Sequence, residues 1–108
     1  MTRRLPTGIL ASALIRRVND VGGFATVRAR GDAQAGSMLL VLAERGCSIR
    51  MVERGIGPNG AAILIDSTPN DDPELYWQRR RAGDPDLWVI ELDVADAERF
   101  AAETILDD

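Results

Sequence analysis

Two short polar segments hold the side chains in this chain that are best suited to binding or catalysis. They combine arginine with aspartate: Arg28, Arg30 and Asp32 in the first segment, and Arg80, Asp84 and Asp86 in the second. Carboxylates serve as general acids or bases and arginines recognise carboxylates and phosphates. Because turns at strand ends commonly display binding groups, we predict that these six residues contribute to a polar recognition surface. The alternative is that they pair with one another and brace the loops.

The second segment could also hold a hard cation. Asp84 and Asp86 are the closest pair of carboxylates that could share an ion such as magnesium. However, Asp84-Pro85-Asp86 has the composition of a turn that leads into a strand, and no EF-hand spacing is present. We therefore predict neither a metal ion nor a cofactor.

Aromatic and basic residues on one expected helix suggest single-stranded nucleic-acid binding. Tyr76 and Trp77 precede three consecutive arginines at residues 79–81. Successive helical residues point about 100° apart, so the three arginines cannot form one flat patch. The formal net charge of −4 also opposes a polyanionic partner. We favour ion pairs with neighbouring acids and consider nucleic acid the less favoured partner.

Residues 55–60 match the spacing G-x-G-x-x-G of dinucleotide-binding proteins. In such proteins a helix follows the glycines, because its N-terminus receives the pyrophosphate. Here a strand-like segment follows, and Pro58-Asn59-Gly60 is a strong turn signal. A β-hairpin is therefore the better interpretation.

The single cysteine, Cys47, is predicted to be a buried and unreactive core residue. It alternates with Ile49 and Met51 on one side of an expected strand. The chain contains no histidine that could convert the thiol to a thiolate. All 13 basic residues are arginines, so Schiff-base lysines and Walker-type phosphate lysines are excluded as well.

Hydrophobic periodicity predicts an alternation of helices and strands. The helices are expected at residues 7–21, 73–82 and 95–106, and the strands at residues 24–30, 38–43, 47–54, 61–66 and 87–94. The run at 38–43 is apolar throughout, as in a central strand covered on both faces. Trp88 is in phase with Ile90 and Leu92, so we expect it in the core. The predicted fold is α+β: an antiparallel sheet of about four to five strands, with the N-terminal helix and one or two later helices packed on it.

The 108 residues are expected to form a single domain, 1–108, with one hydrophobic core. No stretch approaches the ~20 apolar residues of a membrane span, and a lone cysteine suits a reducing compartment. We expect a cytoplasmic protein that is not attached to a membrane. Open sheet edges, or an uncovered sheet face, would suit a homodimer.

Three stretches of the sequence resemble a known family. They are A-L-I-R-R-V-N at residues 13–19, F-A-T-V-R-A-R-G-D-A-Q-A-G at residues 24–36, and D-P-D-L-W-V-I-E at residues 84–91. The chain is similar to the small bacterial family called domain of unknown function 1491. That resemblance implies a small cytoplasmic bacterial protein and provides no catalytic residues.

Three classes of function remain open on the sequence alone. We favour a non-enzymatic binding or adaptor module for a protein partner, because no arrangement of catalytic groups is visible and arginine with tryptophan is typical of interfaces. The second class is a small enzyme or ligand-binding protein that uses Asp32, Asp84 or Asp86 beside Arg30 or Arg80. The third is single-stranded nucleic-acid binding through Trp77 and the arginines.

Overall fold

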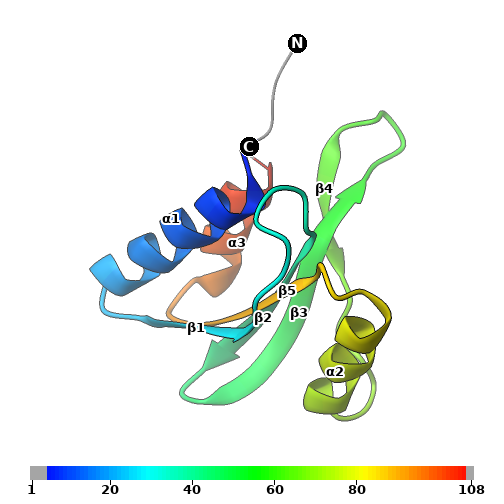
Figure 1. Cartoon of the computed structure of the whole chain (residues 1–108). Helices are drawn as coiled ribbons and strands as arrows, with labels where there is room; N and C mark the ends of the chain where they lie inside the picture. The colour runs from blue at the N-terminus through cyan, green and yellow to red at the C-terminus, as the bar shows by residue number, and fades with distance from the viewer. Residues whose placement is uncertain (1–4, 107–108) are drawn as a thin grey trace.

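Three helices and five strands follow one another along the chain (Figure 1). The computed structural model describes the chain from residue 5 to residue 106, except for the side chains of residues 48 and 49. The elements are α1 (Thr7–Asp20), β1 (Phe24–Ala29), β2 (Met38–Glu44), β3 (Cys47–Ile56), β4 (Ala62–Asp66), α2 (Pro73–Gly83), β5 (Trp88–Asp93) and α3 (Ala97–Leu106). The predicted α+β class is confirmed.

Strand β5 lies in the interior of the sheet, whose order is β1-β5-β2-β3-β4. It pairs antiparallel with β1 but parallel with β2, so the sheet is mixed. The prediction of an antiparallel sheet is therefore wrong for the pair of β2 and β5. The chain reaches β5 from β4 through α2, and a crossover of this kind is what a parallel pair requires. Residues 87–90 are buried without alternation, which suits a strand that has neighbours on both edges and cover on both faces.

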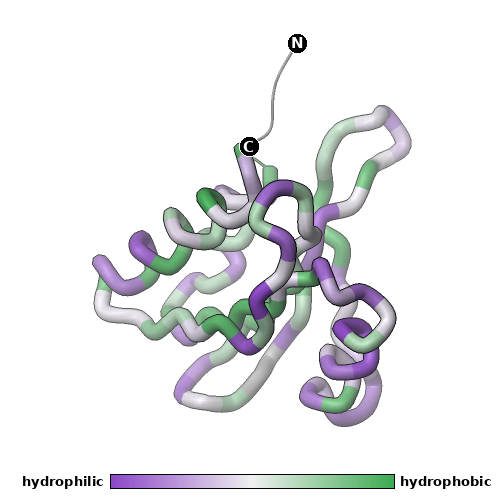
Figure 2. The backbone as a smooth tube through the Cα atoms, viewed as in Figure 1, coloured by the Kyte–Doolittle hydropathy of each residue, from purple (hydrophilic) through white to green (hydrophobic). Residues whose placement is uncertain are grey.

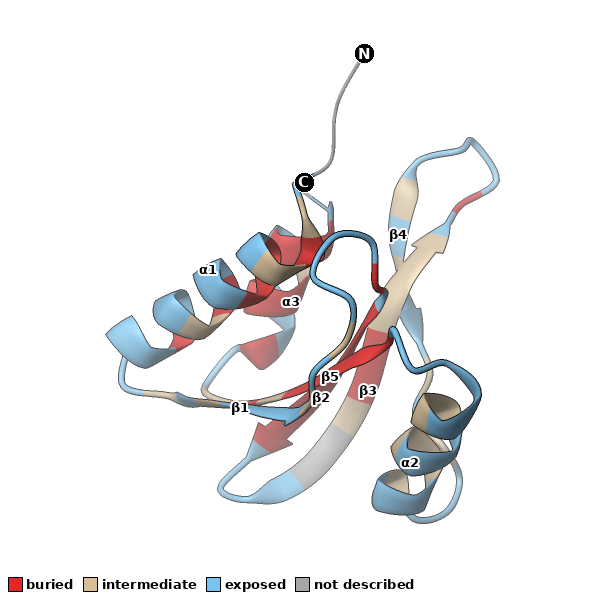
Figure 3. Ribbon diagram, in the orientation of Figure 1, coloured by how far each residue is buried: buried red, intermediate tan, exposed pale blue. Residues whose placement is uncertain are grey.

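Helices α1 and α3 cover one face of the sheet and enclose the larger apolar core (Figure 3). Leu14 and Val18 of α1 and Phe100 of α3 pack there against residues of β2, β3 and β5. Trp88 belongs to this cluster and is 3% exposed, so its predicted place in the core is confirmed. The strand β2 is buried from Met38 to Ala43, as expected of a central strand.

Helix α2 covers only part of the opposite face. It contacts a smaller cluster through Tyr76 and Trp77; the buried members of that cluster are Leu39, Val41, Met51, Leu87 and Val89. No residue of α2 is itself buried, and Figure 2 shows the helix as largely hydrophilic. Its start matches the sequence signals, since the Asp72 carboxylate accepts a hydrogen bond of 2.9 Å from the N–H of Glu74 and Pro73 is the first helical residue.

The prediction that Cys47 is buried is wrong, because this cysteine is exposed. The pairing of β2 with β3 shifts by one residue after Leu42, which faces Arg50, whereas Ala43 faces Ser48. Such a β-bulge breaks the alternation of side chains, so Cys47 no longer shares a face with Met51. Cys47 also lies beside the tight turn at Arg45 and Gly46, which joins β2 to β3.

Residues 55–60 belong to the hairpin that joins β3 to β4, as predicted. The N–H of Gly57 donates to the carbonyl of Ala61 at 2.8 Å, and Gly60 has a φ of 83°, which favours glycine. A strand and not a helix follows this turn. The glycine spacing therefore lacks the helix N-terminus on which dinucleotide binding depends.

Candidate functional site

The two polar segments singled out in the sequence lie side by side. The loop between β1 and β2 contacts the loop between α2 and β5, with a hydrogen bond of 3.0 Å from the N–H of Asp32 to the carbonyl of Asp86. The indole N–H of Trp88 donates to the carbonyl of Asp32 at 2.8 Å. Four of the six predicted site residues are on these loops, whereas Arg28 lies within β1 and Arg80 within α2, one helical turn before Asp84.

Glycine is what allows the two loops to approach so closely. A Cβ atom added at either Gly31 or Gly36 would collide with the carbonyl oxygen of Asp86. The backbones therefore meet with no side chain between them, as expected where two chain segments pack at contact distance. We call this arrangement the loop clasp: residues 30–37 joined to residues 84–88.

The carboxylates of the clasp serve mainly its own backbone. Asp32 Oδ2 accepts hydrogen bonds from the N–H groups of Gln34 and Ala35, at 3.2 and 2.8 Å. Asp84 Oδ1 accepts from the N–H of Asp86 at 3.1 Å. These are the local turn contacts that aspartate favours, so two of the three predicted carboxylates already have partners.

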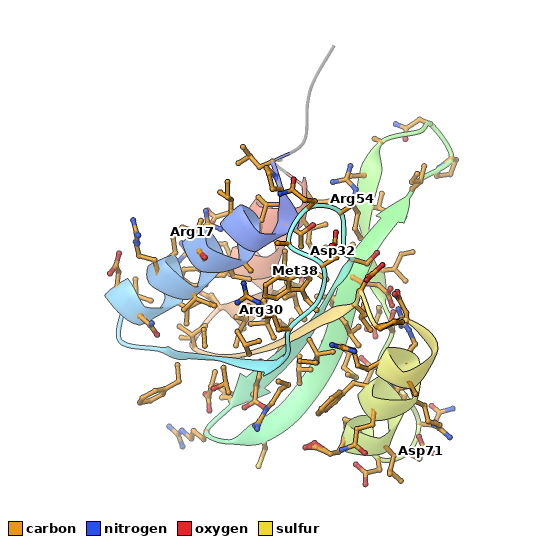
Figure 4. The ribbon with its side chains drawn as sticks, viewed as in Figure 1. Arg17, Arg30, Asp32, Met38, Arg54 and Asp71 are labelled. Carbon is orange, nitrogen blue, oxygen red and sulfur yellow. The ribbon has the colours of Figure 1, made fainter. Side chains whose placement is uncertain are left out.

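Arg30 lies against the core tryptophan. Its guanidinium carbon is 5.3 Å from the centroid of the Trp88 ring, within the range of a cation–π contact. The carbonyl of Arg30 accepts a hydrogen bond of 2.7 Å from Arg81 Nη2. Figure 4 shows Arg30 and Asp32 on the same loop. The clasp thus places one arginine over the core and ties a second one to the backbone.

Arg80 points away from the clasp and holds α2 against β3. Its two terminal nitrogens donate to the two carboxylate oxygens of Glu53, each at 2.9 Å, and Nη1 also donates to the Tyr76 hydroxyl at 2.9 Å. The hydroxyl of Ser67 donates to Glu53 as well. The hydrogen bonds from Arg80 hold the pKa of Glu53 below its ordinary value, although partial burial opposes this shift. The six predicted residues therefore do not share one site.

Arg28 lines a groove of about 380 Å³ between the N-terminal end of α2 and the uncovered part of the sheet. Arg28 Nε and Nη2 both donate to Glu91 Oε1, at 3.1 and 2.7 Å. This contact, with a smaller effect from nearby Glu74, raises the pKa of Arg28. The second oxygen, Glu91 Oε2, has no hydrogen-bond partner among residues 5–106.

The rest of the groove is acidic and aromatic. Trp77, Pro73 and Val41 supply apolar surface, whereas the charged residues of the lining are three acids, Asp72, Glu74 and Glu91, and one base, Arg28. Sequence reasoning missed the role of Glu91 and Glu74. Glu91 could have been found, because alternation along β5 places it on the face opposite to Trp88, where α2 lies.

The three consecutive arginines of α2 have different surroundings. Arg80 binds Glu53, Arg81 binds the backbone of the clasp, and Arg79 is exposed. They do not share one face, in keeping with their helical spacing. Among the described residues, no group of three or more cysteines, aspartates or glutamates is arranged to hold a metal ion. Within the same part of the chain, no helix is long and apolar enough to cross a membrane.

Fold and contacts together define a small α+β domain with a mixed five-stranded sheet, two helices on one face and one on the other. A family model for DUF1491, described as proteins of unknown function, matches residues 5–102, and the chain belongs to this family. No curated protein matches the chain.

Solved structures agree with this assignment. A crystal structure of a DUF1491 family protein from Caulobacter crescentus is 34% identical, with a TM-score of 0.77, and the match covers 90% of this chain and 94% of that one. An NMR structure from the same organism gives 35% identity, a TM-score of 0.74, and coverage of 92% and 94%. Protein Atu0922 from A. tumefaciens is 28% identical, with a TM-score of 0.63 and coverage of 87% and 89%.

Proposed function

We propose that this protein is a non-enzymatic binding module, and that the groove between α2 and the sheet receives a basic side chain of a protein partner. The observation that carries the proposal is the composition of the groove: three acidic residues and a tryptophan line it together with a single arginine. A cation that enters such a groove meets opposite charge on one side and an aromatic ring on the other. The proposed setting is the cytoplasm of a bacterium.

Free acceptor atoms support a cationic guest. Asp72 is engaged as the cap of α2, but Glu91 keeps one carboxylate oxygen without a partner, and the side chain of Glu74 receives no hydrogen bond from any described residue. A guanidinium from the partner would have two acceptors within the groove. Arginine is the better guest than lysine, because its planar group can bond carboxylates while it stacks on an aromatic ring.

The surroundings of the groove suit a protein rather than a small metabolite. Leu75 follows Glu74 on α2 and is 54% exposed, so the helix that borders the groove also offers apolar surface. Interfaces between proteins combine such apolar contacts with a few aromatic and charged anchors. Trp77 is half-buried and already held by the sheet, which limits the entropy lost when it binds.

The alternative of a small enzyme that uses Asp32, Asp84 or Asp86 has less support. The carboxylates of Asp32 and Asp84 accept hydrogen bonds from their own turns. A cavity of about 120 Å³ does lie between α1, α3 and the sheet, but none of these three aspartates lines it. Its polar lining consists of hydroxyl groups, Arg54 and Glu53, and the Glu53 carboxylate is already bound by Arg80 and Ser67. Arg54 in turn donates to the carbonyl of Ile105 at 3.1 Å.

An NMR titration with short synthetic peptides tests the proposal. The first peptide carries one arginine between two leucines, and the second carries glutamine in place of that arginine. We expect the arginine peptide to shift the indole N–H resonance of Trp77 and the amides of β5, and the glutamine peptide to leave them unchanged.

Variants of the chain provide the matched comparison. Glu91→Gln removes a groove carboxylate and should weaken arginine-peptide binding roughly tenfold, the effect of losing about 1.4 kcal/mol. Asp84→Asn removes a carboxylate outside the groove and should bind as wild type does. Equal binding of the two peptides, or an arginine-peptide affinity that Glu91→Gln leaves intact, would refute the proposal.

A further inference from the structure

The hairpin between β3 and β4 carries a long uncharged stretch. Residues 55–65, G-I-G-P-N-G-A-A-I-L-I, contain no charged side chain, although charged residues make up 28% of the protein. Figure 1 shows that the end of this hairpin projects beyond the helices. Surface segments are normally rich in charge, so a neutral stretch at a projecting edge calls for a physical explanation.

Strand β4 is an edge of the sheet, and the hydrogen bonds around it show which backbone groups are free. The N–H of Ser67 donates to the carbonyl of Met51, and the carbonyl of Ala61 accepts from Gly57, each at 2.8 Å. Backbone groups alternate in direction along an antiparallel strand, so Ile63 and Ile65 also pair with β3. Ala62, Leu64 and Asp66 therefore direct their N–H and C=O groups away from the sheet.

The side chains of β4 leave this edge flat and apolar. Ile63 and Ile65 share one face, are 38% and 42% exposed, and lie over Gly55, where an added Cβ would collide with Ile65. Native edge strands are usually protected by charges, proline or a bulge. From Ala62 to Ile65 none of these devices is present, and the pairing with β3 is regular.

We propose that a second copy of this chain pairs with β4, antiparallel about a two-fold axis at Leu64. In this register Leu64 lies opposite the partner's Leu64, and Ile63 lies opposite the partner's Ile65. The free backbone groups of both edges are then satisfied, and the two five-stranded sheets become continuous. The interface uses other elements than the groove at α2, so it stands independently of the proposed function.

Charge favours a second copy over an unrelated strand. The only ionised side chain of β4 is Asp66, which falls opposite the partner's Ala62 and so meets no like charge. Arg50 pairs with it, with Nε 3.2 Å from Asp66 Oδ2, and the same guanidinium also pairs with Glu98. A two-fold pairing of identical strands is self-complementary in this register, as an isologous interface requires.

Sedimentation equilibrium of the full chain provides the first test. We expect wild type to show a monomer–dimer equilibrium that depends on concentration. Ile63→Lys places a charge against the partner's Ile65 and should weaken association at least about tenfold. Ile56→Lys is the matched control: Ile56 is 75% exposed on the same hairpin but lies on β3, away from the edge, so association should be unchanged.

A cross-linking experiment tests the register, in a Cys47→Ser background. Across a hydrogen-bonded antiparallel pair the Cα atoms are about 5.5 Å apart, a distance that a disulfide can bridge. Leu64→Cys should therefore form a covalent dimer on mild oxidation. Ala62→Cys should not, because its two copies would be about 13 Å apart. Circular dichroism of each variant establishes that it is folded.

Three results would overturn the proposal. The first is a wild type that stays monomeric at all concentrations. The second is a dimer that Ile63→Lys leaves intact. The third is equal cross-linking of folded Leu64→Cys and Ala62→Cys, since that would indicate random collision and not a fixed pairing.

Discussion

Trp88 connects the core to the loop clasp through a single side chain. Its ring packs beneath α1 and α3, its indole N–H donates to the carbonyl of Asp32, and the guanidinium of Arg30 lies over the ring. Removal of this side chain would leave a cavity, and the Asp32 carbonyl would keep only its longer hydrogen bond of 3.3 Å from the N–H of Gly36. Large effects of single substitutions are expected at residues of this kind.

We predict that Trp88→Ala lowers the free energy of unfolding by about 3 to 5 kcal/mol. Urea denaturation followed by circular dichroism measures this change. Trp88→Phe, which keeps an aromatic ring but loses the N–H, should cost less. A Trp88→Ala protein that unfolds within about 1 kcal/mol of wild type would contradict the assignment of Trp88 to the core.

Cys47 is predicted to react with thiol reagents in the folded protein, because its side chain is exposed at the hairpin between β2 and β3. Labelling in native buffer should reach one equivalent without denaturant, and mass spectrometry of the product counts the label. Cys47→Ser provides the blank. Labelling that begins only in denaturant would mean that the cysteine is buried, as its spacing from Met51 suggests.

Helix α2 is attached to the sheet by polar contacts more than by apolar burial. None of its residues is buried. Arg80, which also donates to Tyr76 of the same helix, binds Glu53 and so links α2 to β3. Ser67, in the segment after β4, donates to the same carboxylate. Bidentate, charge-assisted hydrogen bonds between arginine and a carboxylate are stronger than hydrogen bonds between neutral groups. The stability of this element should therefore depend on pH.

The sign of that dependence follows from the lowered pKa of Glu53. A carboxyl group whose pKa is lower in the folded state stabilises the fold above its unfolded pKa, near 4.5, and this contribution is lost as the pH falls through the folded pKa. We predict that Glu53→Gln reduces stability at pH 7 and flattens the loss of stability below pH about 4.5. Denaturation at a series of pH values measures both effects.

A control for this prediction is Glu74→Gln, which removes a carboxylate that no described side chain hydrogen-bonds. Below pH about 4.5, its free energy of unfolding should depend on pH as that of wild type does. Arg80→Met removes the other member of the pair and should cost roughly 1 to 3 kcal/mol at pH 7. If wild type and Glu53→Gln lost stability equally below pH about 4.5, the Arg80–Glu53 pair would not control the loss of stability in acid.

Over the whole molecule, the loop clasp holds together segments that are far apart in the sequence. It joins residues 30–37 to residues 84–88, and these stretches include part of the sequence resembling DUF1491. The glycines and aspartates of these two stretches therefore have a structural explanation. The glycines permit contact between the two backbones, and the aspartates accept hydrogen bonds within their own turns. This explanation accounts for the clasp without a ligand.

We predict that Gly31→Ala destabilises the protein by about 1 to 3 kcal/mol, because its Cβ would meet the backbone of Asp86. Gly83→Ala is the matched control, since a Cβ there meets nothing within 4 Å. It should be neutral or slightly stabilising, because alanine loses less entropy than glycine on folding. Thermal unfolding of the two variants compares them directly, and equal melting temperatures would contradict the close approach of the two loops.

The sequence by itself determined every helix and strand to within two residues. Periodicity, caps and turn residues are local signals, and here they agree with the tertiary structure. The cap of α2 at Asp72, the hairpin at residues 55–60 and the burial of Trp88 could each be predicted for this reason. The single surface predicted from Arg28, Arg30, Asp32, Arg80, Asp84 and Asp86 is a different case. The loops of Asp32 and Asp86 do meet, whereas Arg28 and Arg80 pair elsewhere, with Glu91 and Glu53.

Only the tertiary structure decided how these elements are arranged. The insertion of β5 between β1 and β2 depends on pairing between segments that are distant in the sequence. The exposure of Cys47 depends on a one-residue shift in the register of β2 and β3. Neither leaves a mark in local periodicity. The groove of Arg28, Glu91 and Trp77 arises in the same way, because α2 covers part of one sheet face and brings together side chains from separate elements. Long-range packing, and not local preference, sets such positions.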